Sequence, residues 1–270
     1  MRQVRVAEQQ KQQKRRRVFR RGAGALVVAG IVVGIIFAVS GSTPKKAAAP
    51  KVKTTTSTST TLAGTPITTA VSHTAIAPVC PPVTAGGATK RVIAFTKAPP
   101  DCVTAGATYD ATVQTDVGSF VISMPVDASP LAVNNFVFLA RYHYYDGVTF
   151  HRVIPGFVVQ GGDPTGTGSG GPGYSFTGNT PASTCSKTKV CYPLGSVAMA
   201  NSGAASSDGS QFFIVVGPQG ESLPPNYTLF GQVTSGIAVV QKIAADGTPQ
   251  GDPPKVLHHM VKVTITQAAA

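Results

Sequence analysis

Acidic residues are scarce in this sequence, which has 11 Asp and Glu against 23 Lys and Arg and a formal net charge of +12 over 270 residues. An excess of this size usually indicates nucleic acid as a partner, because clustered Lys and Arg neutralise phosphates. Here the excess belongs to the N-terminal part. Residues 1–21 hold +8 and residues 41–75 hold +4, whereas residues 76–270 contain ten basic and ten acidic residues. We therefore expect no nucleic-acid partner.

Motifs of covalent and metal chemistry are also missing. No GxSxG nucleophile elbow surrounds the serines of the Gly/Ser-rich stretch, which argues against a hydrolase triad with His151 and Asp163. We interpret His151 instead as a hydrogen-bonded residue beside a strand. The cysteines lack CxxC spacing, and His258 and His259 would point to opposite faces of a strand, so neither a metal nor another cofactor is expected. The glycine-rich run at 166–173 has no following Lys-Ser/Thr, which favours a mobile surface loop over a phosphate loop.

What is present begins with a long uncharged run at residues 22–42, almost wholly apolar apart from glycine. About 20 apolar residues at 1.5 Å each span the hydrocarbon core of a bilayer, so the run predicts a transmembrane helix. The basic segment 1–21 precedes it, and cytoplasmic flanks carry the Lys/Arg excess. We expect a single-pass anchor in the cell membrane, with the N-terminus cytoplasmic and the rest outside. A signal peptide cleaved near Ala38-Val39-Ser40 is the alternative.

Residues 43–75 are rich in Thr, Ser, Ala and Pro and contain no aromatic residue. Such a segment cannot bury enough apolar surface to offset its ordering entropy, so it is predicted to be a disordered linker. A flexible tether of this kind would keep the following domain near the membrane while letting it move within the reach of the linker.

All four cysteines follow the predicted anchor, two of them in an extension at residues 76–107. An even number outside the cytoplasm favours disulfides. Three pairings are open to four cysteines. We favour Cys80 with Cys102 and Cys185 with Cys191, because each pair brackets a short loop.

The texture changes at residues 108–267, where short β-branched segments alternate with glycine turns. A hairpin is predicted around residues 116–118, and a helix is predicted to follow from an N-cap at Ser129 with Pro130 in its first turn. Five short strand candidates come next, then a helix at 237–245 and a last strand at 259–267. This order predicts a mostly β domain, a closed eight-stranded antiparallel barrel capped by two helices.

Three sequence blocks resemble the signature of one family. FHRVIPGFVVQGGD lies at 150–163, MANSGAASSDGSQFFIV at 199–215 and LPPNYTLFGQV at 223–233. Together with the Pro-initiated helix, these blocks resemble the cyclophilin family of peptidyl-prolyl cis-trans isomerases over residues 108–267. A membrane anchor with a Thr-rich tether is similar to extracytoplasmic members from actinobacteria.

The resemblance implies a role for each matching position. Arg152 corresponds to the catalytic arginine, whose guanidinium lies near the prolyl amide, and Gln160 to the glutamine that orients it. Phe157 and Phe213 correspond to walls of the proline pocket. The remaining positions imply binding of substrate in the pocket or along the adjoining groove: Val158, Ala200, Asn201, Gln211, Leu223 and Tyr227.

The chemistry of prolyl isomerisation suits such a residue set. An Xaa-Pro bond needs no nucleophile, only a site that grips the proline ring and favours the twisted amide over both planar forms. The resemblance implies an isomerase without a cofactor, with a monomeric catalytic domain acting on proline-containing secreted or surface proteins. The alternative is a non-catalytic proline-peptide-binding or chaperone module of the same fold.

The sequence departs from the family pattern in three places. It has no tryptophan, so the tryptophan of cyclosporin-sensitive members is replaced by the neighbourhood of Ser222, and tight cyclosporin binding is not expected. The stretch at 203–209 is one residue longer than usual. The loop closed by Cys185 and Cys191 is absent from many members, and we interpret it as a surface elaboration.

Overall fold

The computed structural model describes residues 74–84, 86–181, 185, 190–204 and 206–268. The predicted basic segment, the transmembrane helix and nearly all of the linker lie outside these residues. Within the described part of the chain, every helix is too short or too polar to cross a membrane.

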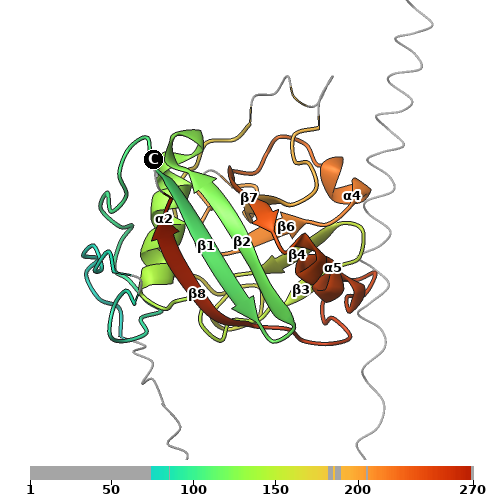
Figure 1. The fold of residues 1–270 in the computed structure, drawn as a ribbon, viewed down its shortest axis with the longest axis horizontal. Helices are drawn as coiled ribbons and strands as arrows, with labels where there is room; N and C mark the ends of the chain where they lie inside the picture. Colours follow the sequence, from blue (N-terminus) through green and yellow to red (C-terminus); the bar gives the residue numbers. More distant parts are fainter. Residues whose placement is uncertain (1–73, 85, 182–184, 186–189, 205, 269–270) are drawn as a thin grey trace, which may run out of the picture. The chain divides into compact units, whose positions relative to one another are not determined.

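The described domain is built on one curled sheet of eight strands in the order β3-β4-β6-β5-β7-β2-β1-β8 (Figure 1), and all neighbours pair antiparallel. The predicted strands are all present. Their bounds are β1 Thr108–Thr115, β2 Gly118–Pro125, β3 Arg152–Ile154, β4 Val158–Gly161, β5 Ser196–Met199, β6 Phe212–Val215, β7 Leu229–Ser235 and β8 Met260–Gln267.

The β1–β2 hairpin follows directly from the local sequence. Thr115 pairs with Gly118 across a two-residue turn, as predicted. Gly118 has a φ of +138°, and a Cβ there would lie 2.8 Å from a Val239 methyl group of the helix packed on the turn. Glycine is required by both the backbone conformation and the close approach. Along β1, side chains alternate between core and surface, which fixes the register of the hairpin.

The prediction of a closed barrel is only partly met, because the edge strands β3 and β8 do not pair along their length in the described sheet. One isolated bridge, Thr149 with His259, joins the segments that precede them. The Phe150 N–H donates to the His258 carbonyl at 2.9 Å, and the Met260 N–H donates to Val148 at 2.8 Å. Beyond this crossing the two strands separate, and β3 has only three residues. The result is a half-barrel.

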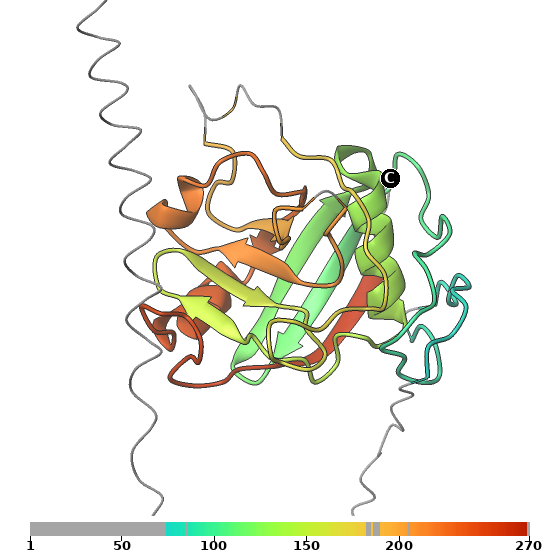
Figure 2. The ribbon, with the colours of Figure 1, turned by 180° about the vertical axis from the view of Figure 1, so that it is seen from behind.

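Two helices pack on this sheet, as predicted, at well-separated places in both views (Figures 1 and 2). α2 (Pro130–Arg141) contacts β7 and β8, and α5 (Ile237–Ala245) contacts β2, β3 and β4. Two short helices, η1 (Val126–Ala128) and α4 (Pro218–Glu221), were not predicted. Pro130 begins α2 as expected, but the buried Ser129 hydroxyl makes no capping hydrogen bond.

The buried side chains form two clusters on opposite faces of the central strands. The larger one fills the half-barrel with aromatic residues, among them Phe136, Tyr145 and Phe212. The smaller one lies on the other face and is made of Val158, Cys191, Tyr192, Ala198, Phe213 and Val215.

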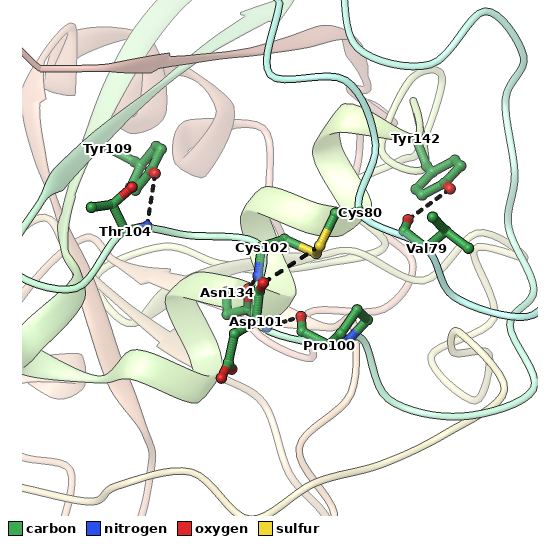
Figure 3. The surroundings of a disulfide bond; sticks show 9 residues. All are labelled: Val79, Cys80, Pro100, Asp101, Cys102, Thr104, Tyr109, Asn134 and Tyr142. Atoms are coloured by element: carbon green, nitrogen blue, oxygen red, sulfur yellow. Dashed lines mark hydrogen bonds between the residues drawn. A yellow bond between two sulfur atoms is a disulfide. The ribbon is translucent and has the colours of Figure 1, made fainter.

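Both predicted disulfides are present. Cys80–Cys102 ties the extension together beside α2 (Figure 3). Asn134 of α2 accepts a hydrogen bond from the Cys102 N–H at 2.7 Å and donates one to the Pro100 carbonyl at 2.9 Å. Phe95 of the extension is buried in the larger core. The extension is therefore part of the packed domain.

Candidate active site

One pocket brings together nine of the ten residues that the sequence singled out. It is a cavity of about 170 Å³ on the outer face of the sheet, beside the smaller cluster. Its lining is contributed by β3, the β3–β4 turn, β4, the segment after β5, β6 and the segment before β7: Arg152, Phe157, Val158, Gln160, Ala200, Asn201, Phe213, Leu223 and Tyr227.

Strand alternation and register bring these side chains to one face. Arg152 of β3 pairs with Gln160 of β4, and Gln160 pairs with Phe213 of β6. Successive side chains of a strand point to opposite faces. Phe212 consequently enters the larger core, while Phe213 joins the pocket. The same alternation separates Val159 from Val158.

Arg152 is held by an amide and an aromatic ring. Its Nη1 donates to Gln160 Oε1 at 3.2 Å, and its Cζ lies 5.6 Å from the centroid of the Phe157 ring. The ion pairs among the described residues all join a histidine to an aspartate, so the half-buried guanidinium has no carboxylate partner there. Donors of Arg152 remain for a ligand in a pocket that also presents the apolar side chains of Phe157 and Phe213.

The hydrogen bonds continue from Gln160 into a neighbouring groove of about 420 Å³, where the tenth residue, Gln211, lies. Gln160 Nε2 donates to Gln211 Oε1 at 3.1 Å. Gln211 Nε2 in turn donates to the carbonyl oxygens of Gly168 and Gly170 at 2.9 and 3.0 Å. The orientation of Arg152 is thereby connected to the glycine-rich loop at 166–173.

This loop lies on the surface, as predicted, and it also forms a wall of the groove. Asp163, 1% exposed, accepts hydrogen bonds from the main-chain N–H groups of Thr165, Thr167 and Gly170. Burial alone would raise the pKa of Asp163, but hydrogen bonds from the Gly170 N–H, the Thr165 hydroxyl and the N–H groups of Thr165 and Gly168 outweigh it and lower the pKa to about 2. A side chain at Gly170 would collide with this carboxylate.

His151 departs from the prediction. The ring is 3% exposed, and neither nitrogen has a hydrogen-bond partner in the described part of the chain. Burial lowers its pKa. No triad forms with Asp163, whose oxygens bond the glycine-rich loop, or with Ser210, whose hydroxyl donates to the Gly162 carbonyl. Among the described residues, no group of His, Cys, Asp and Glu is arranged to hold a metal ion.

The far wall of the pocket is formed by Leu223 and Tyr227. The Tyr227 ring meets the Phe213 ring edge-on, with centroids 5.1 Å apart. Asn201 supports this wall, because its Nδ2 donates to the Asn226 carbonyl at 3.1 Å. Ser222 is exposed and lies outside the pocket lining, with its hydroxyl donating to Pro218. The aromatic surface of the pocket therefore comes from Phe157, Phe213 and Tyr227.

Sequence reasoning missed two parts of the site. The main-chain carbonyls of Gly168 and Gly170 bind Gln211, and a carbonyl leaves no mark in a residue pattern. Tyr192 lies under the pocket and bonds the main chain of Tyr227. It precedes β5 at a position that no motif covered, so periodicity gave no signal for it.

Comparisons with known proteins agree with this geometry. The family described as cyclophilin type peptidyl-prolyl cis-trans isomerase/CLD matches residues 111–266. A peptidyl-prolyl cis-trans isomerase of Arabidopsis thaliana is 39% identical over 162 residues, which cover 60% of this chain and 94% of that protein. Peptidyl-prolyl cis-trans isomerase B of Bacillus subtilis is 46% identical over 118 residues, covering 44% and 78%.

A solved structure is similar as well. A cyclophilin-type isomerase of Cryptosporidium parvum superposes with a TM-score of 0.52 at 27% identity, covering 60% of this chain and 99% of that one. The same protein crystallised in the presence of the dipeptide Ala-Pro gives a TM-score of 0.51 at 28% identity and covers 58% and 98%.

Proposed function

Because the chain belongs to the cyclophilin-type peptidyl-prolyl cis-trans isomerases, its reaction is rotation about Xaa-Pro bonds, and we propose that Arg152 and its pocket perform it. The observation that carries this proposal is the guanidinium of Arg152. It is oriented by Gln160 beside the side chains of Phe157 and Phe213, with no carboxylate partner within the described chain.

The pocket is suited to a proline ring. Phe157, Phe213 and Leu223 offer apolar surface, and about 170 Å³ matches a small cyclic side chain rather than a large one. Gripping the ring while the preceding carbonyl turns selects a rotated geometry. Part of the binding energy of the proline ring then favours the rotated amide over the planar forms.

Arg152 supplies the electrostatic part. Resonance gives the amide bond its barrier of about 18–20 kcal/mol, and twisting the bond returns the lone pair to the prolyl nitrogen. A fixed guanidinium can donate a hydrogen bond to that nitrogen in the twisted state and not in the planar ones. Each gain of about 1.4 kcal/mol at that point raises the rate tenfold. Arginine stays charged throughout, so no proton is transferred.

The substrates that we propose are proline-containing polypeptides in extended form. The groove beside the pocket supports this, because it continues past Ala200 and Asn201 along Gln211. The relative from Cryptosporidium parvum was crystallised in the presence of Ala-Pro.

We further propose that the domain is anchored in the cell membrane and works outside the cytoplasm. The apolar run at 22–42, the basic segment before it and the Thr-rich tether after it support this. The two disulfides agree with an oxidising compartment.

An isomerase assay on a proline tetrapeptide tests the catalytic proposal. Arg152→Ala is expected to lower kcat/KM by roughly a hundredfold, since it removes a charge-assisted hydrogen bond made in the transition state. Arg152→Lys keeps the charge without the planar fork and should fall between the two. Equal rates for Arg152→Ala and the wild type would contradict the catalytic role of Arg152 and favour a module that only binds proline peptides.

A further inference from the structure

Tyr192 lies beneath the proline pocket without lining it. The side chain is fully buried, and its hydroxyl serves a single neighbour twice. The Tyr192 Oη–H donates to the Tyr227 carbonyl at 2.8 Å, and the same oxygen accepts the Tyr227 N–H at 2.9 Å. One phenol therefore satisfies both main-chain polar groups of a residue that forms the pocket wall.

The ring of Tyr192 also contacts the pocket from below. Its centroid lies 6.5 Å from that of Phe213 and 6.2 Å from that of Tyr227, both in edge-to-face geometry. Phe213 and Tyr227 meet each other edge-on as well. Each of the three rings contacts the other two, and a shift of the buried one displaces the two that line the pocket.

The residue before Tyr192 is cross-linked. Cys191 is 6% exposed and belongs to the same small cluster as Phe213, and Cys185 packs against that cluster. The loop was interpreted as a surface elaboration, but Cys191 at its end is buried. The other bridge, Cys80–Cys102, lies beside α2 and outside the small cluster.

We propose that Tyr192, held in place by the Cys185–Cys191 bridge, is a positioning residue for the proline pocket, so that substrate affinity depends on the oxidation state of that bridge. The inference rests on the pocket assigned above. Tyr192 reaches the substrate only through Tyr227 and Phe213. Because these two residues hold the proline ring in the planar and twisted forms alike, losing their position should raise KM more than it lowers kcat.

The redox step is ordinary thiol–disulfide exchange. A dithiol such as dithiothreitol attacks the bridge, gives up two electrons and two protons and closes to a cyclic disulfide, while Cys185 and Cys191 each become a thiol. The cross-link before Tyr192 is then gone, although the Tyr192 hydroxyl remains.

The first test is Tyr192→Phe, which keeps the ring and removes the hydroxyl. The Tyr227 N–H and C=O lose their partner, and we expect KM for a proline tetrapeptide to rise roughly three- to tenfold with kcat within about twofold of wild type. Tyr109→Phe is the matched control, since that buried tyrosine also bonds main chain, at the Thr104 N–H, far from the pocket residues in sequence and on β1. It should leave KM unchanged.

The second test compares the two bridges. The double variant Cys185→Ser/Cys191→Ser should raise KM in the same way as Tyr192→Phe, and Cys80→Ser/Cys102→Ser should not. Dithiothreitol should raise the KM of the wild type and of Cys80→Ser/Cys102→Ser, and leave that of Cys185→Ser/Cys191→Ser unchanged. Thermal unfolding of each variant shows whether it is folded under assay conditions.

The outcomes distinguish a failure of the positioning role of Tyr192 from a failure of the isomerase assignment. Loss of activity in Arg152→Ala, with an unchanged KM in Tyr192→Phe, would overturn the positioning role and leave the isomerase assignment intact. If Cys185→Ser/Cys191→Ser fails to fold, dithiothreitol on the wild type decides: an unchanged KM once both bridges are reduced overturns the link to oxidation state.

Discussion

At the scale of single residues, the proposed active site is a chain of side-chain amide contacts that ends on one arginine. Gln160 accepts from Arg152 and donates to Gln211, so it sets both the direction of the guanidinium and its distance from the groove. The sequence predicted which residues meet here because a distinctive motif carries them. It did not predict Tyr192, whose contribution depends on the main chain of Tyr227, 35 residues away.

Replacing Gln160 tests the orienting role. Gln160→Ala frees the Arg152 guanidinium, and we expect kcat to fall roughly tenfold with a smaller change in KM, because the lost contact acts on the transition state. Gln232→Ala is the matched control, since that glutamine of β7 bonds the Leu194 carbonyl away from the pocket. A kcat for Gln160→Ala within twofold of that of the wild type would contradict the proposal that Gln160 orients Arg152.

His258 gives a pH-dependent prediction. It is 4% exposed and lies between two carboxylates, with Nδ1 2.7 Å from Asp116 and Nε2 2.9 Å from Asp246. Burial alone would lower the pKa of His258, but the hydrogen bonds to Asp246 and Asp116 and their charges outweigh it and raise the pKa. The ion pairs join the β1–β2 turn to the end of α5.

The direction of the pH dependence follows from the linkage between protonation and folding. A raised pKa in the folded state means that the imidazolium's contribution to stability is complete below the unfolded pKa of about 6.5 and is lost as pH rises through the folded value. Urea unfolding should show His258→Gln destabilised most near pH 5.5, with the difference from wild type shrinking toward pH 9. A constant difference over that range would contradict the charged bridge.

At the scale of elements, the sequence predicted the helices and the hairpin correctly, because local residues determine them. It did not predict correctly whether the two edges of the sheet close into a barrel. The hairpin, α2 and α5 follow from turn residues, a proline and helical spacing, all within a few residues of one another. Whether β3 and β8 pair is decided by segments more than 100 residues apart. The crossing of residues 148–150 onto 258–260 has no local mark, so a closed barrel was expected where a half-barrel forms.

The glycine-rich loop offers a test at this scale. Its conformation depends on the ionised Asp163, whose lowered pKa of about 2 corresponds to about 2 kcal/mol of stability at neutral pH. Asp163→Asn should lose about that much free energy of unfolding at pH 7. Because a depressed pKa contributes above the unfolded value and is lost as pH falls through the folded one, the difference should narrow at pH 3. Denaturant unfolding at the two pH values measures it.

At the scale of the whole molecule, we propose that the net charge of +12 sets the membrane topology of the chain. The domain from residue 76 onward is neutral, and the excess flanks the apolar run at 22–42. Fractionation of cells expressing the full chain tests the proposed anchor. The chain should stay with membranes after carbonate extraction, whereas a variant beginning at residue 43 should not. If the mature full chain begins at Gly41 or later, the apolar run is a cleaved signal peptide and not an anchor.

We propose that Arg152 catalyses the rotation, whereas the pocket binds proline even when Arg152 is replaced. Two-dimensional NMR exchange spectroscopy on a proline tetrapeptide reports binding and rotation in the same sample. We predict that the wild type gives exchange peaks between the cis and trans forms, and that Arg152→Ala still shifts the peptide resonances but gives exchange roughly a hundredfold slower than the wild type. Exchange of equal strength in Arg152→Ala would contradict the account.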